Sequence, residues 1–297
     1  MNKYCPICKG ERIKTEYYGT IRNGGLGKYT EKPVEVLRCE DCGVIWHEPL
    51  VDTAKYYQSD DYRMSLEDSV DELDFYRLHD KESIDKLQYT GMNFRNRVVA
   101  DIGCGCGAFL DLVSGVSKDV IAIEPTQKYR EVMERKGYKV YPYMSEALNE
   151  WEGKVDEVVS FDVIEHVDTP IEFLSQARRL LRTGGRVVIG TPTETPVMRK
   201  LLGEVYERKI LFSVQHQWVF CEESIKRIAI MAGFKDNEIR IRYFQRYGLT
   251  NALGWLNSKE AGSFVPEGIV SETMDRVWKS ELESQGISDY LVLYAVR

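Results

Sequence analysis

The sequence predicts an α/β chain whose core is a doubly wound, mostly parallel sheet of seven strands with an antiparallel last strand. Three observations predict it. From residue 97 onward, apolar runs of strand length alternate with helical patterns, and a glycine-rich turn follows the first of these strands. Hydrophobic residues make up 43% of the 297 residues, which is enough for a large core. Strands that alternate with helices form parallel sheets covered on both faces.

The predicted strands are short apolar runs bounded by glycine, proline or polar residues. They cover residues 98–102, 120–123, 139–141, 155–161, 186–191, 239–243 and 290–294. The last two are separated by a long stretch, 247–285, that shows no regular pattern. We therefore expect these two strands to form an antiparallel pair.

The helices between the strands are predicted from apolar spacing and end signals. One begins at Ala108, and another is capped by Thr126 and stops at Gly137. A third is closed by Gly184 and Gly185, and a fourth ends at Gly233.

Composition divides the chain into three predicted parts. Residues 1–50 are rich in Cys, Gly and Tyr without a helical period, and we expect a metal-binding module there. Residues 51–95 are charged and helical in pattern, as in a linker or lid, and 96–297 form the α/β domain with an insert at about 247–285. The apolar face expected in the helical part comprises Tyr57, Tyr62, Leu66, Val70, Leu73 and Tyr76.

Charge and termini narrow the function classes. The net charge of −7 and pI near 5.4 argue against a protein that mainly grips phosphate backbones, so nucleic acid is an unlikely partner. The first residues do not resemble a signal peptide, and no apolar run approaches the ~18 residues of a membrane span. We therefore expect a cytoplasmic protein with reduced cysteines.

Four cysteines form two C-x2-C pairs, 30 residues apart. They are Cys5, Cys8, Cys39 and Cys42. Two such pairs place four thiolates around one ion, so a structural Zn²⁺ in a zinc-ribbon-like module is the prediction. A redox dithiol is the alternative. The remaining cysteines, Cys104, Cys106 and Cys221, are expected to be small buried thiols.

The glycine-rich turn follows the first predicted strand and opens a helix. It contains Asp101, Gly103, Gly105 and Gly107, and Glu124 ends the next strand, where a carboxylate can accept ribose hydroxyls. The turn also satisfies the dinucleotide fingerprint, which would indicate NAD. An acid two residues before the first glycine would crowd a pyrophosphate but suits a ligand with a cationic amino group.

This turn resembles that of class I S-adenosylmethionine (SAM)-dependent methyltransferases, which have a Rossmann-like fold. The segments 160–167, 180–189 and 216–234 resemble further motifs of the branch that includes ubiquinone-biosynthesis O-methyltransferases. These motifs occur in the family's order over about residues 97–245. The resemblance implies SAM as the cofactor.

The resemblance also implies roles for individual residues. The methionine end of SAM would be held by Asp101, Gly103, Gly105 and Gly107. Glu124 would bind the ribose, Pro125 would flank it, and the end of the third strand, Tyr143 and Met144, would face the adenine. The sulfonium side would be lined by Phe161, Asp162 and Val163, with Phe161 as a core residue the alternative.

Two family branches carry a similar four-cysteine module. They are sugar C-methyltransferases acting on nucleotide-linked deoxysugars and a group of ribosomal-RNA guanine methyltransferases. The sugar branch has a catalytic glutamate before a histidine, whereas this chain has Gln215 before His216. Glutamine cannot take a proton from carbon, which argues against C-methylation.

Candidate bases are few, because the chain has four histidines. His216 and His166 follow motifs at the carboxyl edge of the sheet, so we expect His216 to act as general base and His166 to orient the substrate. His47 and His79 are assigned no role. Arg246, in the aromatic segment 243–247, is interpreted as a phosphate ligand or, alternatively, as a solvated residue beside packed aromatics.

The expected reaction is methylation of a small polar acceptor, a hydroxyl or phosphate of a sugar or nucleotide-linked sugar in glycan biosynthesis. C-methylation of a nucleotide-linked ketosugar, RNA base methylation and a non-catalytic SAM-binding regulator are the alternatives.

Overall fold

The computed structural model describes residues 4–59, 64, 71–91, 93–260 and 268–297. The chain forms two compact units. The first unit contains Met1–Glu48, Thr191–Ile225 and Ile241–Val292, and the second contains Pro49–Gly190, Lys226–Arg240 and Leu293–Arg297.

The main sheet has seven strands in the order β10-β11-β8-β7-β4-β5-β6, which confirms the predicted fold class. The strands are β4 (Val98–Ile102), β5 (Asp119–Ile123), β6 (Lys139–Tyr141), β7 (Val155–Phe161), β8 (Leu181–Pro192), β10 (Ile239–Phe244) and β11 (Tyr290–Val296). β4 is an interior strand, is buried along its whole length and pairs in parallel with β5 and β7. The strand order reverses between β4 and β7, and ligands of such sheets bind at the carboxyl ends beside this reversal.

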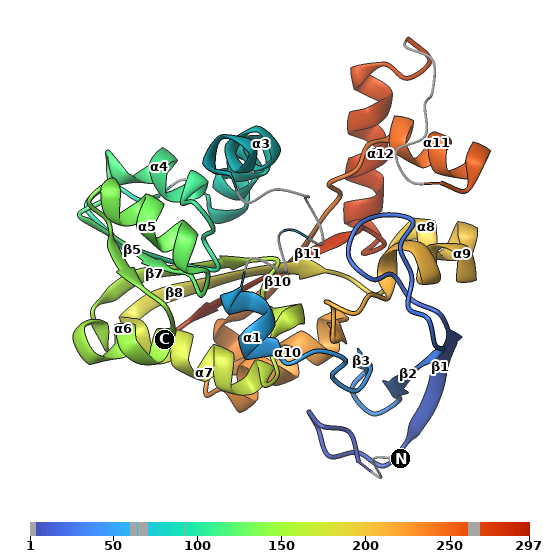
Figure 1. Ribbon diagram of the computed structural model, residues 1–297, viewed down its shortest axis with the longest axis horizontal. Coiled ribbons are helices and arrows are strands. Elements are labelled where there is room, and N and C mark those ends of the chain that lie inside the picture. The colour runs from blue at the N-terminus through green and yellow to red at the C-terminus, as the bar shows by residue number, and fades with distance from the viewer. Residues whose placement is uncertain (1–3, 60–63, 65–70, 92, 261–267) are drawn as a thin grey trace. The chain divides into compact units, whose positions relative to one another are not determined.

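Helices cover both faces of this sheet (Figure 1). One face carries α3 (Glu72–Thr90), α4 (Ala108–Ser114) and α5 (Gln127–Arg135). The other carries α6 (Met144–Trp151), α7 (Pro170–Leu180) and α10 (Glu222–Met231). Short helices are α1 (Thr53–Gln58), η1 (Ile164–His166) and η3 (Asp236–Glu238).

Two boundaries differ from the sequence prediction by four or five residues. α7 ends at Leu180 rather than at the glycine pair, and β8 begins at Leu181 rather than at residue 186. The strand begins early because Leu181 pairs with Val155 of β7. Gly184 N–H also donates to Arg297 O, and Arg297 N–H donates to Gly185 O. The helix α6 was not predicted.

The stretch 247–285 is not irregular, and that expectation was wrong. It contains α11 (Leu249–Ser258) and α12 (Glu272–Ser284). The N-terminus of α12 is capped by Ser271, whose side chain accepts from Met274 N–H. Gly254 and two asparagines weaken the helical signal of α11, so packing of its buried Trp255 outweighs propensity there.

The apolar face expected for residues 51–95 is only partly observed. Tyr62, Leu66 and Val70 lie outside the described residues. Leu73 is 65% exposed, so its assignment to the buried face was wrong; Phe75 is buried in its place.

The first unit is built on a small antiparallel sheet of order β1-β2-β3-β9. Its strands are β1 (Ile13–Gly19), β2 (Val34–Cys39), β3 (Ile45–Trp46) and β9 (Trp218–Val219). The helical segments α8 (Val197–Leu202), α9 (Glu204–Tyr206) and η2 (Glu207–Leu211) follow β8 in the chain.

A network of largely buried ion pairs connects these strands to the segment after β8. Arg38 contacts Glu16 at 2.9 Å and also pairs with Glu194. Arg199 contacts Glu16 at 2.6 Å, Glu194 at 3.1 Å and Glu207 at 2.7 Å. All five side chains are 11–17% exposed, so the network fixes the cysteine-bearing strands to residues 194–207.

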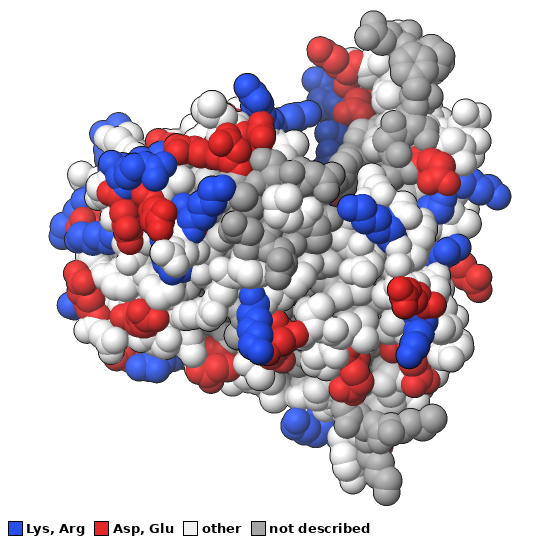
Figure 2. All heavy atoms as spheres, viewed as in Figure 1, with Lys and Arg blue, Asp and Glu red and all other residues white. Residues whose placement is uncertain are grey.

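Among the described residues, no helix is long and apolar enough to cross a membrane. On the face drawn in Figure 2, the described basic side chains are interspersed with acidic ones.

Candidate cofactor and metal sites

In the turn after β4, two glycines combine a left-handed backbone with a close approach to a neighbouring side chain. Gly103 and Gly105 have φ of +75° and +55°, which favour glycine. A Cβ at Gly105 would lie 2.3 Å from the Phe75 ring, and one at Gly103 would lie 2.3 Å from Val163 Cγ2. The backbone of the turn is therefore in close contact with α3 on one side and with the segment after β7 on the other.

Helix α3 holds the turn in place. Phe75 is 6% exposed and packs in a buried cluster with Cys106, Ala108 and Tyr129. Tyr76 adds a hydrogen bond from its hydroxyl to Cys106 O at 3.0 Å. The turn is thus fixed before any ligand binds, which reduces the entropy lost on binding.

Glu124 ends β5 and is 5% exposed. Its carboxylate accepts hydrogen bonds from Gly105 N–H and Thr126 N–H, both at 2.9 Å. A carboxylate has about four lone-pair sites, so each oxygen can accept a further bond from a ligand hydroxyl. Glu124 lines the adjoining cavity, where such hydroxyls would lie.

Asp101 is 4% exposed within β4. Burial raises the pKa of its carboxyl to about 7, while Lys86 acts to lower this pKa and Glu124 to raise it. A bound cation would favour the charged carboxylate. Asp101, Gly105 and Gly107 lie outside the set of residues that line the cavity.

A cavity of about 310 Å³ lies within the second unit. It lies beside the strand-order reversal, because its lining residues follow the carboxyl ends of β4, β5 and β7. The cavity brings together eight predicted residues: Gly103, Glu124, Pro125, Tyr143, Met144, Asp162, Val163 and His166. Its size and mixed lining suit a small-molecule cofactor.

The sequence did not reveal the contribution of α1, which supplies Thr53 and Tyr57 to this cavity. The Tyr57 hydroxyl lies 2.9 Å from His166 Nδ1, and Thr126 Oγ1 donates to Tyr57 O at 3.1 Å. Gln58 Nε2 donates to the Tyr143 hydroxyl at 2.6 Å. These bonds tie α1 to the ends of β5, β6 and β7.

The segment after β7 contains an uncommon backbone conformation. Asp162 has φ of +56° although it is not glycine, and it lines the cavity. Such strain clusters at functional sites. Phe161 is 5% exposed, packs against Tyr89 and Phe109, and is not among the lining residues, which favours its interpretation as a core residue.

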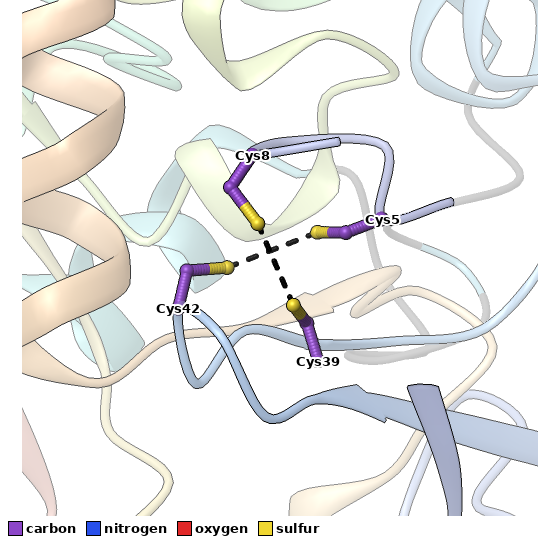
Figure 3. A group of neighbouring side chains, drawn as sticks. All are labelled: Cys5, Cys8, Cys39 and Cys42. Carbon is purple, nitrogen blue, oxygen red and sulfur yellow. Dashed lines mark hydrogen bonds between the residues drawn. The ribbon is translucent and has the colours of Figure 1, made fainter. Parts of the chain in front are cut away.

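The four paired cysteines point toward one centre in the first unit (Figure 3). Their Sγ atoms all lie within 4.8 Å of one another; Cys5 to Cys42 is 3.8 Å and Cys8 to Cys39 is 3.5 Å. Sulfurs bound to one tetrahedral Zn²⁺ at ~2.3 Å would lie ~3.8 Å apart. The arrangement therefore fits Zn²⁺.

The two cysteine turns have the same backbone design. Lys9 N–H donates to Cys5 O at 3.0 Å, and Gly43 N–H donates to Cys39 O at 2.8 Å. Lys9 and Gly43 both have left-handed φ, of +62° and +77°. Each turn thus presents its two sulfurs in the same way.

The other cysteines are buried or partly buried thiols, as expected. Burial raises the pKa of Cys104 well above its usual value, which keeps this thiol neutral. Cys221 lies next to the cluster, with its Sγ 3.6 Å from Cys42 O.

Of the remaining histidines, His47 is buried, and its two ring nitrogens lie 2.8 Å from Glu48 O and 3.0 Å from Ser213 O. These contacts with backbone oxygens indicate a structural role for His47. His216 lines a second cavity, within the first unit, together with Arg246.

The fold is that of class I SAM-dependent methyltransferases. Residues 75–239, more than half of the chain, match the sequence profile of the methyltransferase domain family. The chain therefore belongs to that family.

Individual relatives agree with this assignment. A ubiquinone biosynthesis O-methyltransferase from Roseobacter denitrificans is 28% identical over 42% of this chain and 54% of its own. A probable S-adenosylmethionine-dependent methyltransferase from Mycolicibacterium smegmatis is 26% identical over 63% of this chain and 68% of its own. The chain thus spans about half to two thirds of the length of these relatives.

A solved SAM-dependent methyltransferase from Archaeoglobus fulgidus shares the fold. Its TM-score is 0.52 at 21% identity, over 75% of this chain and 96% of its own.

Proposed function

We propose that this chain catalyses the transfer of a methyl group from SAM to a hydroxyl or phosphate oxygen of a small polar acceptor, a sugar or nucleotide-linked sugar. The cavity of the second unit carries this proposal, because its glycine turn and Glu124 lie beside the strand-order reversal. When bound, SAM supplies an electrophilic methyl group on a sulfonium. In-line displacement of this kind depends mainly on position.

We assign the residues in and around the cavity to different parts of SAM. Glu124 would accept the ribose hydroxyls with the lone pairs that Gly105 and Thr126 leave. Asp101 would provide negative charge behind the turn for the amino group of the methionine end. Tyr57 would close the cavity over the ligand while holding His166.

Support for an oxygen acceptor comes from relatives such as the ubiquinone biosynthesis O-methyltransferase of Roseobacter denitrificans. Carbon methylation is disfavoured, because Gln215 is 3% exposed and its side-chain oxygen accepts from Gly24 N–H at 3.3 Å. Gln215 thus has a structural partner and no carboxylate. RNA methylation is disfavoured by the net charge of −7 and by the mixed charges in Figure 2.

For the cysteine cluster we propose one structural Zn²⁺. Four thiolates would leave no coordination position for a substrate, so its role would be to hold the two turns together. The narrow sulfur spacing supports this proposal.

Glu124→Ala should weaken SAM binding on the order of 100-fold or more, because charge-assisted hydrogen bonds are each worth about 1.5–3 kcal/mol. Titration calorimetry with SAM and S-adenosylhomocysteine measures this loss. Glu131→Ala, an exposed glutamate on α5, is the matched control and should bind normally. Binding of NAD without SAM by the wild type would overturn the proposal.

SAM affinity should rise with pH between about 6 and 8. The pKa of Asp101 is raised to about 7, so the carboxyl is half protonated at neutral pH, and a cationic ligand must displace that proton. The same raised pKa means that stability of the ligand-free fold falls as pH rises from the unfolded pKa toward 7. Asp101→Asn should bind more weakly and lose this pH dependence. An equal slope in both proteins would contradict the assignment.

A further inference from the structure

The cavity of the first unit has a volume of about 480 Å³ and includes five aromatic side chains in its wall. The aromatic lining residues are Tyr206, Trp218, Tyr247, Trp255 and Trp278. Trp218 and Trp255 are buried, and the rings of Tyr206 and Trp255 are 5.9 Å apart. Aromatic walls of this kind pack against the faces of ring-shaped ligands.

Arg246 is held in place at the cavity. Its guanidinium lies 4.0 Å from the centre of the Tyr290 ring, and its Nε lies 4.0 Å from Asp289 Oδ1. The Asp289 carboxylate also accepts from the N–H groups of Arg246 and Tyr247, at 2.9 and 3.2 Å, and from Gln245 Nε2 at 2.8 Å. Asp289 therefore organises the turn that carries Arg246, and its charge is shared among several donors.

The cavity is positively charged. Apart from His216, the only acidic or basic side chains among its described lining residues are those of Arg22, Arg246 and Asp289. Two guanidiniums against one shared carboxylate leave a net positive charge, and His216 adds to it when protonated. Guanidiniums bind phosphate and carboxylate groups through paired hydrogen bonds.

We propose that this cavity binds a small ring-bearing anion. The phosphate or carboxylate of that ligand would contact Arg246 and Arg22, and its ring would lie against the tryptophans. This inference goes beyond the proposed methyl transfer and does not depend on it.

The test uses the full chain saturated with S-adenosylhomocysteine. Three probes are titrated: glucose 1-phosphate, glucuronate and the neutral methyl glucoside, followed by tryptophan fluorescence and calorimetry. We expect at least one anionic sugar to bind about tenfold or more tightly than methyl glucoside, because charge-assisted hydrogen bonds exceed neutral ones. The tighter of the two anions identifies the group as phosphate or carboxylate.

Arg246→Gln should weaken that binding about tenfold or more. Arg246→Lys should weaken it less, because the charge remains while the paired geometry is lost. Arg242→Gln, an exposed arginine on β10, is the matched control and should bind as the wild type does. Affinity of the wild type should also fall as salt rises.

Measurements on the wild-type protein alone can refute the proposal. It is wrong if the neutral and anionic sugars bind equally well, or if their binding does not depend on salt. The affinity for S-adenosylhomocysteine, measured in the same samples, distinguishes this proposal from the methyl-transfer proposal. The Arg246→Gln variant should bind S-adenosylhomocysteine as the wild type does. If the wild type does not bind S-adenosylhomocysteine, the methyl-transfer proposal is refuted, and the sugar titration without cofactor still tests this cavity.

Discussion

Cys39→Ser should release zinc and unfold the cysteine-bearing part of the first unit. Four thiolates whose sulfurs lie 3.5–3.8 Å apart across the cluster match one tetrahedral ion, and serine cannot replace a thiolate ligand. The free energy of zinc binding in small modules is ~10–16 kcal/mol and acts as folding energy. Loss of one cysteine ligand should therefore lower the stability of the protein more than any other single substitution that we consider.

The expected damage should extend beyond the two cysteine turns. Cys39 ends β2, and Arg38 beside it belongs to the ion network with Glu16 and Glu194. If the turn at Cys39 opens, Arg38 loses its fixed position, and buried carboxylates lose a partner. We expect increased hydrogen exchange in β1 and β2 and in residues 194–207.

Metal analysis of the wild type should give about one zinc per chain, and a chelator should reproduce the effect of Cys39→Ser. Cys221→Ser is the matched control: its sulfur lies near Cys42 O, yet it is not one of the four clustered ligands, so zinc should stay. Metal-free protein with an intact fold, or a reversible disulfide between these cysteines, would refute the structural role.

The sequence predicted the sheet well because the central strands carry unambiguous signals. β4, β6 and β7 have the predicted bounds, since each is an apolar run bounded by glycine, polar residues or proline. The glycine turn and Glu124 were also predictable, because strand, turn and next strand are consecutive and their geometry is local.

The features that could not be predicted from the sequence depend on contacts between residues that are distant in the chain. Tyr57 meets His166 across 109 positions, and nothing in the local pattern of α1 indicates that pairing. The cavity at Arg246 depends on Asp289, which is 43 residues further along the chain. The helices α11 and α12 were missed because their apolar residues are mixed with charged, polar and glycine residues.

The position of His166 defines how it can take part in the reaction. It is 8% exposed, lines the cofactor cavity and has its Nδ1 2.9 Å from the Tyr57 hydroxyl. If Nδ1–H donates to that hydroxyl, Nε2 carries the lone pair and can accept a hydrogen bond that orients a substrate hydroxyl. Tyr57 would then be a positioning residue that selects the tautomer.

His216→Ala should lower single-turnover methylation by ~10²–10⁴, the usual contribution of a general base, while SAM affinity stays nearly unchanged. We expect His216 to act as base and His166 to orient the hydroxyl, so His166→Ala should also lower the rate. Tyr57→Phe should lower it less and shift the pH profile, an effect that a purely structural contact would not produce. The acceptor is first identified by screening phosphosugars and glycosides with methyl-labelled SAM.

The variants also distinguish which histidine takes the proton. If the replaced histidine is the base, the reaction rate should no longer rise with pH through the range in which histidines titrate. If the replaced histidine only orients the substrate, that rise should remain, and KM for the acceptor should increase. Full turnover in both His216→Ala and His166→Ala would mean that neither is the base, and that positioning or the carboxylate of Glu165 carries the reaction.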